Sequence, residues 1–122
     1  MAMRGIRGAT TVDANDKESI WHAAQVLMTK LMSANQLSTD QIGAAIFSST
    51  EDLTAAFPTT GVRKLPSFSM VPMFDTRQLA IENSLPMCIR VLVLVDTDCS
   101  ANEISHVYLN GARTLRPDLI SN

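Results

Sequence analysis

One charged residue interrupts the most apolar segment of the chain, and this interruption constrains both the fold and the function. Residues 87–95 read MCIRVLVLV, a run rich in β-branched side chains that predicts a buried central strand with Arg90 inside it. A guanidinium shut away from water is strongly unfavourable unless an anion meets it. No acidic residue lies beside Arg90 in the sequence, so its partner is either a carboxylate from elsewhere in the protein or an anionic ligand.

A second arginine-containing segment favours the ligand. Residues 4–12 repeat the pair Arg-Gly and place Arg4 and Arg7 beside small residues, where a flat anion can approach the backbone closely. The ten basic residues comprise seven Arg and three Lys, and arginine is suited to bidentate recognition of planar carboxylates. We therefore expect an anion-binding site built on arginine.

Composition and charge limit the remaining possibilities. With 122 residues, of which 46% are hydrophobic and 18% charged, the chain is expected to form a single folded domain over residues 1–122. The formal net charge of -2, without a run of basic residues, argues against nucleic acid or membrane as a partner. The apolar segments are strand-sized and no signal peptide is recognisable, so the cytoplasm is the expected location.

The cysteines and histidines do not form a metal-binding pattern. Cys88 and Cys99 make no Cys-x-x-Cys pair, and His22 and His106 lie far apart in the sequence. We expect no metal, and we expect both cysteines to be reduced structural residues.

The hydrophobic pattern alternates between the periods of strands and helices. The expected strands cover residues 6–12, 42–49, 68–74, 87–95 and 106–109. A long helix is expected to begin at a capping box of Asn15 with Glu18 and to end at Asn35, and a short helix is expected to open at Pro58. The buried stripe of the long helix is expected to contain Ile20, Ala24, Leu27, Met28 and Leu31.

Pro72 lies inside the expected strand 68–74 and cannot donate to a ladder, so this strand is expected at a sheet edge or a subunit boundary. Further helical turns are expected to start in residues 38–41 and 100–103, and Asn110-Gly111 is a turn dipeptide. The pattern predicts an α+β or α/β protein in which a mixed sheet carries helices on one face. So small a sheet leaves edges that favour assembly into an oligomer.

Five blocks in the same order resemble the monofunctional chorismate mutases of the AroH class, the type known from Bacillus. The blocks are RGIRGATTV at 4–12, DL at 52–53 with FP at 57–58, CIRV at 88–91, HVYL at 106–109 and LRPDL at 115–119. They span essentially the whole chain, and their combination is far more specific than any one of them. The resemblance implies a homotrimeric pseudo-α/β-barrel with active sites at the clefts between subunits. It also implies an enzyme of the shikimate pathway, in aromatic amino acid biosynthesis, that uses no cofactor.

The implied reaction is the pericyclic (Claisen) rearrangement of chorismate to prephenate, which needs no nucleophile, metal or redox centre. The protein must hold the reactive conformer and place cationic donors at the ether oxygen, where negative charge grows as the C–O bond breaks. The resemblance implies that Arg90 reaches the ether oxygen and a carboxylate, and that Arg7 and the Tyr108 hydroxyl also bind carboxylate. Further positions that it implies at the pocket are Phe57, Arg63, Met73, Phe74, Leu115 and Arg116. From the residues alone, Tyr108 also fits a core position, and Arg63 and Arg116 also fit a solvated surface.

The chain departs from the family pattern inside the pocket. Relatives typically carry Glu where this chain has Gln78, and that carboxylate receives the ring hydroxyl of the substrate; many carry Cys where this chain has Asp75. Some relatives also carry Lys where this chain has Thr60. We hypothesise that the carboxylate has moved: a turn-like backbone would direct Asp75 and Gln78 towards one cleft, with Asp75 as the anionic acceptor and Gln78 as its neutral partner.

Four other interpretations remain open at this point. Asp75 fits a solvated turn residue with Gln78 as a chance substitution, and a lost carboxylate also fits a pocket that no longer catalyses. The scaffold also fits a noncatalytic protein that binds a carboxylated metabolite. The last interpretation is a RidA-like imine deaminase, a related trimeric barrel that also holds a carboxylate with arginine, although its characteristic motifs are not evident here.

Overall fold

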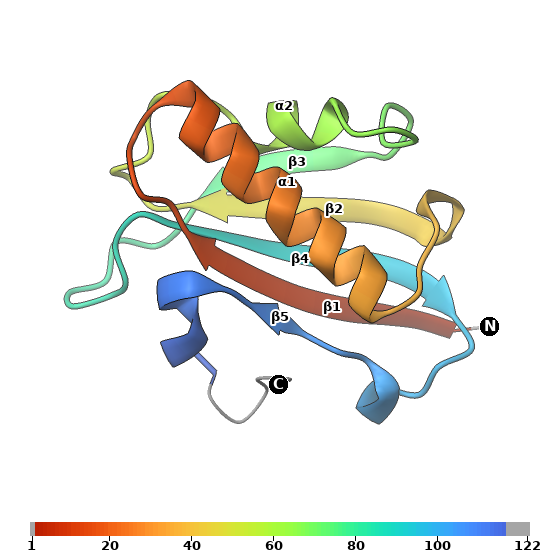
Figure 1. Cartoon of the computed structure of the whole chain (residues 1–122). Helices are drawn as coiled ribbons and strands as arrows, with labels where there is room; N and C mark the ends of the chain where they lie inside the picture. The colour runs from red at the N-terminus through yellow and green to blue at the C-terminus, as the bar shows by residue number, and fades with distance from the viewer. Residues whose placement is uncertain (1, 117–122) are drawn as a thin grey trace.

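The computed structural model describes residues 2–116, and within them five strands form one mixed sheet in the order β3-β2-β4-β1-β5 (Figure 1). Both α-helices of this part of the chain lie on the same face of the sheet. The elements are β1 (Ala2–Thr11), α1 (Lys17–Ala34), β2 (Ile42–Ser49), α2 (Pro58–Arg63), β3 (Met73–Arg77), β4 (Cys88–Thr97) and β5 (Val107–Tyr108). Short 3-10 helices are η1 (Thr39–Gln41), η2 (Ala101–Glu103) and η3 (Asn110–Thr114). The predicted α+β fold is confirmed.

The strand that carries Arg90 occupies the centre of the sheet, as its apolar composition predicts. β4 pairs antiparallel with β1 on one side and with β2 on the other. The outer strands β3 and β5 run parallel to their neighbours β2 and β1. Edge positions therefore belong to the two shortest strands, which limits the length of unpaired backbone at each edge.

The core lies between α1 and the sheet. All five residues that the helical spacing assigned to the buried stripe of α1 are completely buried. They pack against side chains from alternate positions of β1 and β4, among them Ile6, Val91 and Val93. This period of two fixes the sheet face to which every other residue of β4 points.

The two helices approach each other unusually closely at Gly61. A Cβ atom added there would lie 2.7 Å from the Cα atom of Trp21 on α1, so no larger residue fits without moving a helix. The Gln25 amide also donates a hydrogen bond to the Gly61 carbonyl at 2.9 Å. These contacts hold α2, and with it the Phe57 that precedes it, at a fixed place beside the sheet.

The start of α1 differs from the prediction by one residue. Asp16, not Asn15, is the N-cap, and its carboxylate accepts the Ser19 N–H at 2.8 Å. This hydrogen bond holds the pKa of the Asp16 carboxyl below its usual value. The Asn15 side chain instead accepts from the backbone N–H groups of Thr54 and Ala55 and so fastens the loop that follows β2. The predicted end at Asn35 is confirmed.

The expected strand at residues 68–74 is wrong for most of its length. Turn hydrogen bonds link Phe68 to Leu65 and Val71 to Phe68, and the strand begins only at Met73. Pro72 therefore precedes β3, where its carbonyl accepts the Ala45 N–H at 2.9 Å. The expected edge position of this strand is confirmed.

The face of the sheet that carries no α-helix combines arginines with apolar side chains. Val91 and Val93 point towards α1, so Arg90 and Leu92 point away from it. Directly paired residues share a face, and the ladders define two adjacent rows on this side. One row is Thr76, Ser48, Arg90, Ala9 and Tyr108; the next is Phe74, Ile46, Leu92 and Arg7. Cations and uncovered hydrophobic groups thus lie next to each other.

Candidate active site

Arg90 is held in a half-buried position on the helix-free face. Its Nε atom is buried, and within residues 2–116 it has no hydrogen-bond partner. The neighbouring Cys88 thiol is completely buried; burial raises its pKa, and the Arg90 guanidinium partly offsets that rise. A buried donor without a partner is costly, so the geometry leaves Arg90 in need of an acceptor.

A cavity of about 490 Å³ surrounds this guanidinium. The described residues that line it are Arg7, Gly8, Ala9, Arg90, Val91, Tyr108, Leu115 and Arg116. They include three arginines and no carboxylate, so among these lining residues nothing supplies the internal anion considered from the sequence. The structure therefore brings together five predicted site residues: Arg7, Arg90, Tyr108, Leu115 and Arg116. The remainder of the LRPDL block, residues 117–119, lies outside the described residues.

β1 and β5 position two of these groups. Gly8 pairs with Val107 and Ala9 with Tyr108, which places the Tyr108 ring next to Arg90 across the small Ala9 side chain. The ring packs in a small cluster with Cys88 and Ala112. Because Tyr108 is only 7% exposed, its orientation is set by packing rather than by solvent.

The Arg7 backbone makes a contact that the sequence analysis missed. Its N–H donates to Nδ1 of His106 at 2.9 Å, so the imidazole occupies a place that a backbone carbonyl normally takes beside a strand. Burial lowers the pKa of His106, and the positive charges of Arg7 and Arg116 lower it further. The signal available in the sequence was the HVYL block, in which His106 precedes Tyr108 by two residues.

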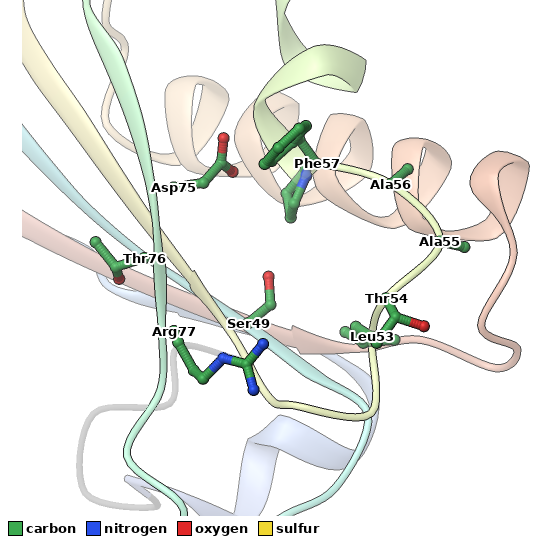
Figure 2. A pocket seen from close by; sticks show the side chains of 10 residues that line it. Ser49, Leu53, Thr54, Ala55, Ala56, Phe57, Asp75, Thr76 and Arg77 are labelled. Carbon is green, nitrogen blue, oxygen red and sulfur yellow. The ribbon is translucent and has the colours of Figure 1, made fainter.

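A second cavity, of about 520 Å³, lies between β3 and the loop that leads into α2 (Figure 2). Its lining residues are Ser49, Leu53, Thr54, Ala55, Ala56, Phe57, Pro58, Asp75, Thr76 and Arg77. Figure 2 shows Asp75 and Arg77 extending from β3 towards the loop that carries Phe57. Arg77 was not among the predicted site residues.

The carboxylate of Asp75 is already engaged within the chain. It accepts the Thr59 N–H at 3.3 Å and the Thr59 hydroxyl at 2.5 Å, and so ties β3 to the first turn of α2. Asp75 pairs with the core residue Phe47 and therefore points to the helix-bearing side, opposite to Arg90.

The turn-like backbone that we expected around Asp75 and Gln78 is wrong, because residues 73–77 form β3. Gln78 follows the strand and lines a different cavity, between residues 50–52 and residues 79–86. Its Oε1 atom is buried and lacks a hydrogen-bond partner within the described residues. Asp75 and Gln78 thus do not share a cleft within one protomer.

The remaining predicted positions also lie away from the Arg90 cavity of the same protomer. Arg63 is the exposed last residue of α2. Met73 packs against the core, on the helix-bearing face of the sheet. Phe74 stands on the helix-free face and is 66% exposed. The predicted site residues outside the Arg90 cavity therefore do not gather at one place in the described chain.

Within residues 2–116, no group of three or more His, Cys, Asp or Glu side chains is arranged to hold a metal ion. No helix in this part of the chain has both the length and the apolar character needed to cross a bilayer. Cys88 and Cys99 are free thiols.

Among the described residues, the cavity around Arg90 is lined by three arginines and no carboxylate, and such a lining on a small α+β sheet suits an anionic small molecule. The family model for chorismate mutase type I matches residues 3–119. The chain is 43% identical over 120 residues to chorismate mutase AroH of Thermus thermophilus, covering 98% of both chains. It is 38% identical over 119 residues to chorismate mutase AroH of Bacillus subtilis, covering 98% of this chain and 94% of that protein.

The solved structures agree with this result. A chorismate mutase from Clostridium thermocellum superimposes with a TM-score of 0.88 at 38% identity, covering 91% of this chain and 98% of that one. The protein belongs to the chorismate mutase type I family. This membership confirms the AroH-class resemblance and rules out the imine deaminase alternative.

Proposed function

We propose that this protein rearranges chorismate to prephenate at sites shared between the subunits of a homotrimer. Family membership makes it a chorismate mutase, an isomerase of aromatic amino acid biosynthesis. The residue roles, the shared site and the assembly are our proposals, as are the single domain over residues 1–122 and the cytoplasmic location.

The observation that carries the proposal is the buried Nε of Arg90, which has no partner among the described residues and faces a cavity lined by three arginines. A small dianion such as chorismate supplies the missing acceptors. As the ether C–O bond breaks and the new C–C bond forms, negative charge grows on the ether oxygen. A fixed guanidinium at that oxygen stabilises the transition state more than the ground state.

The other cavity residues bind and orient the substrate. Arg7 and the Tyr108 hydroxyl bind a carboxylate, and Arg116 adds positive charge to the same cavity. Leu115 supplies an apolar wall. These contacts use binding energy to hold the enolpyruvyl group over the ring. Because the reactive conformer is then already formed, the barrier of this unimolecular step is lower.

Gln78 is the better candidate for the group that meets the ring hydroxyl of chorismate. Its buried Oε1 has no partner among the described residues, so it has an acceptor position to offer. Both oxygens of Asp75, in contrast, already accept from Thr59. In this proposal the neutral Gln78 amide accepts the ring hydroxyl in place of the carboxylate that relatives typically carry. Asp75 holds the first turn of α2 through Thr59.

The separation of the site residues within one protomer supports a shared site. The Arg90 group lies on the helix-free face, whereas Phe57 and Asp75 line a separate cavity between β3 and the loop before α2, with Asp75 pointing to the helix-bearing side. A neighbouring subunit therefore has to bring its Phe57 side, with Arg63 at the other end of α2, to the open Arg90 cavity. We propose that each cleft combines these two surfaces.

The uncovered apolar row supports assembly through the helix-free face. Phe74, Ile46 and Leu92 are 66%, 37% and 39% exposed and lie in register across three strands. A contiguous apolar patch of this kind marks an interaction surface. A closed homotrimer buries the row on every subunit and leaves no copy of it exposed.

The proposal is tested by incubating purified protein with chorismate and following chorismate loss together with prephenate formation. A stable mimic of the cyclic transition state should bind much more tightly than chorismate, because the site is built for the transition state. A protein that binds chorismate and the mimic equally well, and forms no prephenate, is a binding protein and contradicts the proposal.

A further inference from the structure

The strand that carries Tyr108 is too short to hold itself in place. β5 has two residues and pairs with β1 only through Gly8 and Ala9, with one more hydrogen bond from the Leu109 N–H to the Ala9 carbonyl. So short a ladder gives little stability alone. Yet β5 carries one proposed substrate-binding group and leads into η3 and Leu115.

Two side chains extend this ladder where backbone pairing stops. The Asn35 amide donates to the Ser105 carbonyl and accepts the Ser105 N–H, both at 2.8 Å, as a paired strand would. The His106 Nδ1 atom accepts the Arg7 N–H at 2.9 Å. The segment before Tyr108 is therefore fastened to the end of α1 on one side and to Arg7 on the other.

Only one form of the imidazole can make the second contact. Accepting at Nδ1 requires a neutral ring with its proton on Nε2, because a doubly protonated ring has no lone pair to offer. Among the described residues, the charged groups that shift the pKa of His106 are Arg7 from β1 and Arg116 after η3, and both are cations. The α1 side contributes the neutral Asn35 amide. Protonation would remove the acceptor and add a positive charge that Arg7 and Arg116 already disfavour.

We propose that His106 is a positioning residue that holds Arg7 and Tyr108 in binding geometry through its neutral imidazole, so that the site loosens when this ring is protonated. The inference rests on the proposed function, because it assumes that Arg7 and Tyr108 contact chorismate. It identifies a group that does not touch the substrate but holds two groups that bind its carboxylate.

Two variants separate the acceptor from the rest of the side chain. His106→Asn places an amide oxygen near the position of Nδ1 and cannot be protonated, whereas His106→Leu removes the acceptor. His22→Asn is the matched control, since His22 is exposed on α1 and no site role is assigned to it. Each protein is compared with the parent by steady-state kinetics between about pH 5 and about pH 8, the range in which histidine titrates.

At neutral pH, His106→Leu should lose about 10- to 100-fold in kcat/KM, the scale of a small misplacement of a binding group. Most of the loss should be a rise in KM, because the carboxylate that Arg7 binds is charged in both ground and transition states. A merely structural role would lower the amount of active protein, and so reduce apparent kcat at an unchanged KM.

His106→Asn should retain kcat/KM within about threefold of the parent at neutral pH, because its amide oxygen accepts the Arg7 N–H. The parent and His22→Asn should lose kcat/KM as the pH falls through the pKa of His106, which in the folded chain lies below the ordinary value of about 6.5, and His106→Asn should not. Parental kinetics in His106→Leu would overturn the inference. If His106→Leu does not fold, His106→Asn decides the matter, since a parental acid limb in that variant refutes it.

A second readout does not depend on catalysis. The pKa of His106 is lowered in the folded chain, so the unfolded chain binds the proton first and stability falls as the pH drops below about 6.5. Thermal unfolding of the parent and His22→Asn should therefore lose more stability on acidification than that of His106→Asn. A parent without mutase activity contradicts the proposed function, whereas equal losses in all three proteins contradict the role of His106.

Discussion

At the scale of single residues, a cation in an apolar strand is informative because burying it away from water costs free energy unless an anion pairs with it. Arg90 could be singled out from the sequence because its neighbours form a strand that buries both faces in part. Its pairing with Ala9 and Ser48, which leaves room above the guanidinium, depends on the register of three strands and could not be predicted.

Replacing Arg90 by Lys tests whether catalysis needs the planar guanidinium with its fixed donors or only a positive charge. Lysine keeps the positive charge but loses the rigid donor geometry, so turnover should fall by about 100-fold or more, the scale of losing a transition-state donor. Circular dichroism should show the parental fold. Near-parental turnover by a folded Arg90→Lys protein would contradict the proposal that the Arg90 guanidinium stabilises the charge on the ether oxygen.

Asp75 is expected to matter for stability first. Asp75→Ala leaves the buried Thr59 N–H and hydroxyl without their acceptor and should cost about 1 to 3 kcal/mol in the free energy of unfolding. A double-mutant cycle with Thr59→Val, followed by urea denaturation at one fixed protein concentration, should show coupling between the two side chains. Unchanged stability with lost turnover would restore Asp75 as the carboxylate of the site.

Gln78 is expected to matter for substrate binding. Gln78→Ala removes the acceptor proposed for the ring hydroxyl and should lower kcat/KM by about 10-fold, the effect of roughly one lost hydrogen bond. Gln78→Glu restores the residue typical of the family and should retain or raise activity. Equal kinetics for the parent, Gln78→Ala and Gln78→Glu would show that position 78 does not contact chorismate.

At the scale of elements, the hydrophobic periodicity of the sequence correctly predicted those elements whose buried face follows a regular local pattern. The strand at residues 42–49 and the stripe of α1 match the structure residue for residue, because burial on one face imposes a period that the sequence displays. The helix start was misplaced because Asn15 and Asp16 both suit an N-cap. The contact of Asn15 with the loop at Thr54, 39 residues away, decides between them.

The prediction of a strand from Phe68 onward was wrong because the local pattern of this segment also fits a second structure, a series of turns. The segment is rich in apolar residues, as a buried strand is, but Ser67 adopts a positive φ of 70° and the chain turns through residues 65–71. Phe68 and Val71 are buried all the same, because they pack into the core from turns. Burial alone therefore did not distinguish a turn from a strand.

The contact between α1 and α2 gives a test at this scale. Gly61→Ala forces a Cβ atom to within 2.7 Å of the Trp21 Cα atom and should destabilise the fold by about 1 to 3 kcal/mol. Tryptophan fluorescence should report the shift, since Trp21 is the chain's one tryptophan. The matched control is Gly43→Ala, where the nearest atom, the Leu94 carbonyl oxygen, lies at an ordinary 3.7 Å. Equal stability in both variants would show that α2 adjusts freely.

At the scale of the whole molecule, the sequence predicted the composition of the site better than its arrangement. Arg7, Arg90 and Tyr108 could be grouped through the family resemblance, and the structure places them around one cavity. The opposite orientation of Asp75 depends on the pairing of β3 with β2, which begins only after the misjudged turn. Residues supplied by a second subunit lie beyond what the pattern of one chain specifies.

The central claim is that each active site combines the Arg90 side of one subunit with the Phe57 side of another, and subunit mixing tests it most directly. Arg90→Ala removes the proposed transition-state cation, and Phe57→Glu adds a negative charge where a dianion must enter, so each variant alone should be nearly inactive. Light scattering should show a homotrimer for both.

Unfolding and refolding the two variants together should restore part of the activity, because some clefts then pair an intact Arg90 with an intact Phe57. The control mixture of Arg90→Ala with Arg7→Ala should stay inactive, since both residues lie on the same subunit's side of each cleft. Recovery in the first mixture and not in the second is the result that the shared site predicts. A first mixture as inactive as its components, or an active monomer, would contradict it.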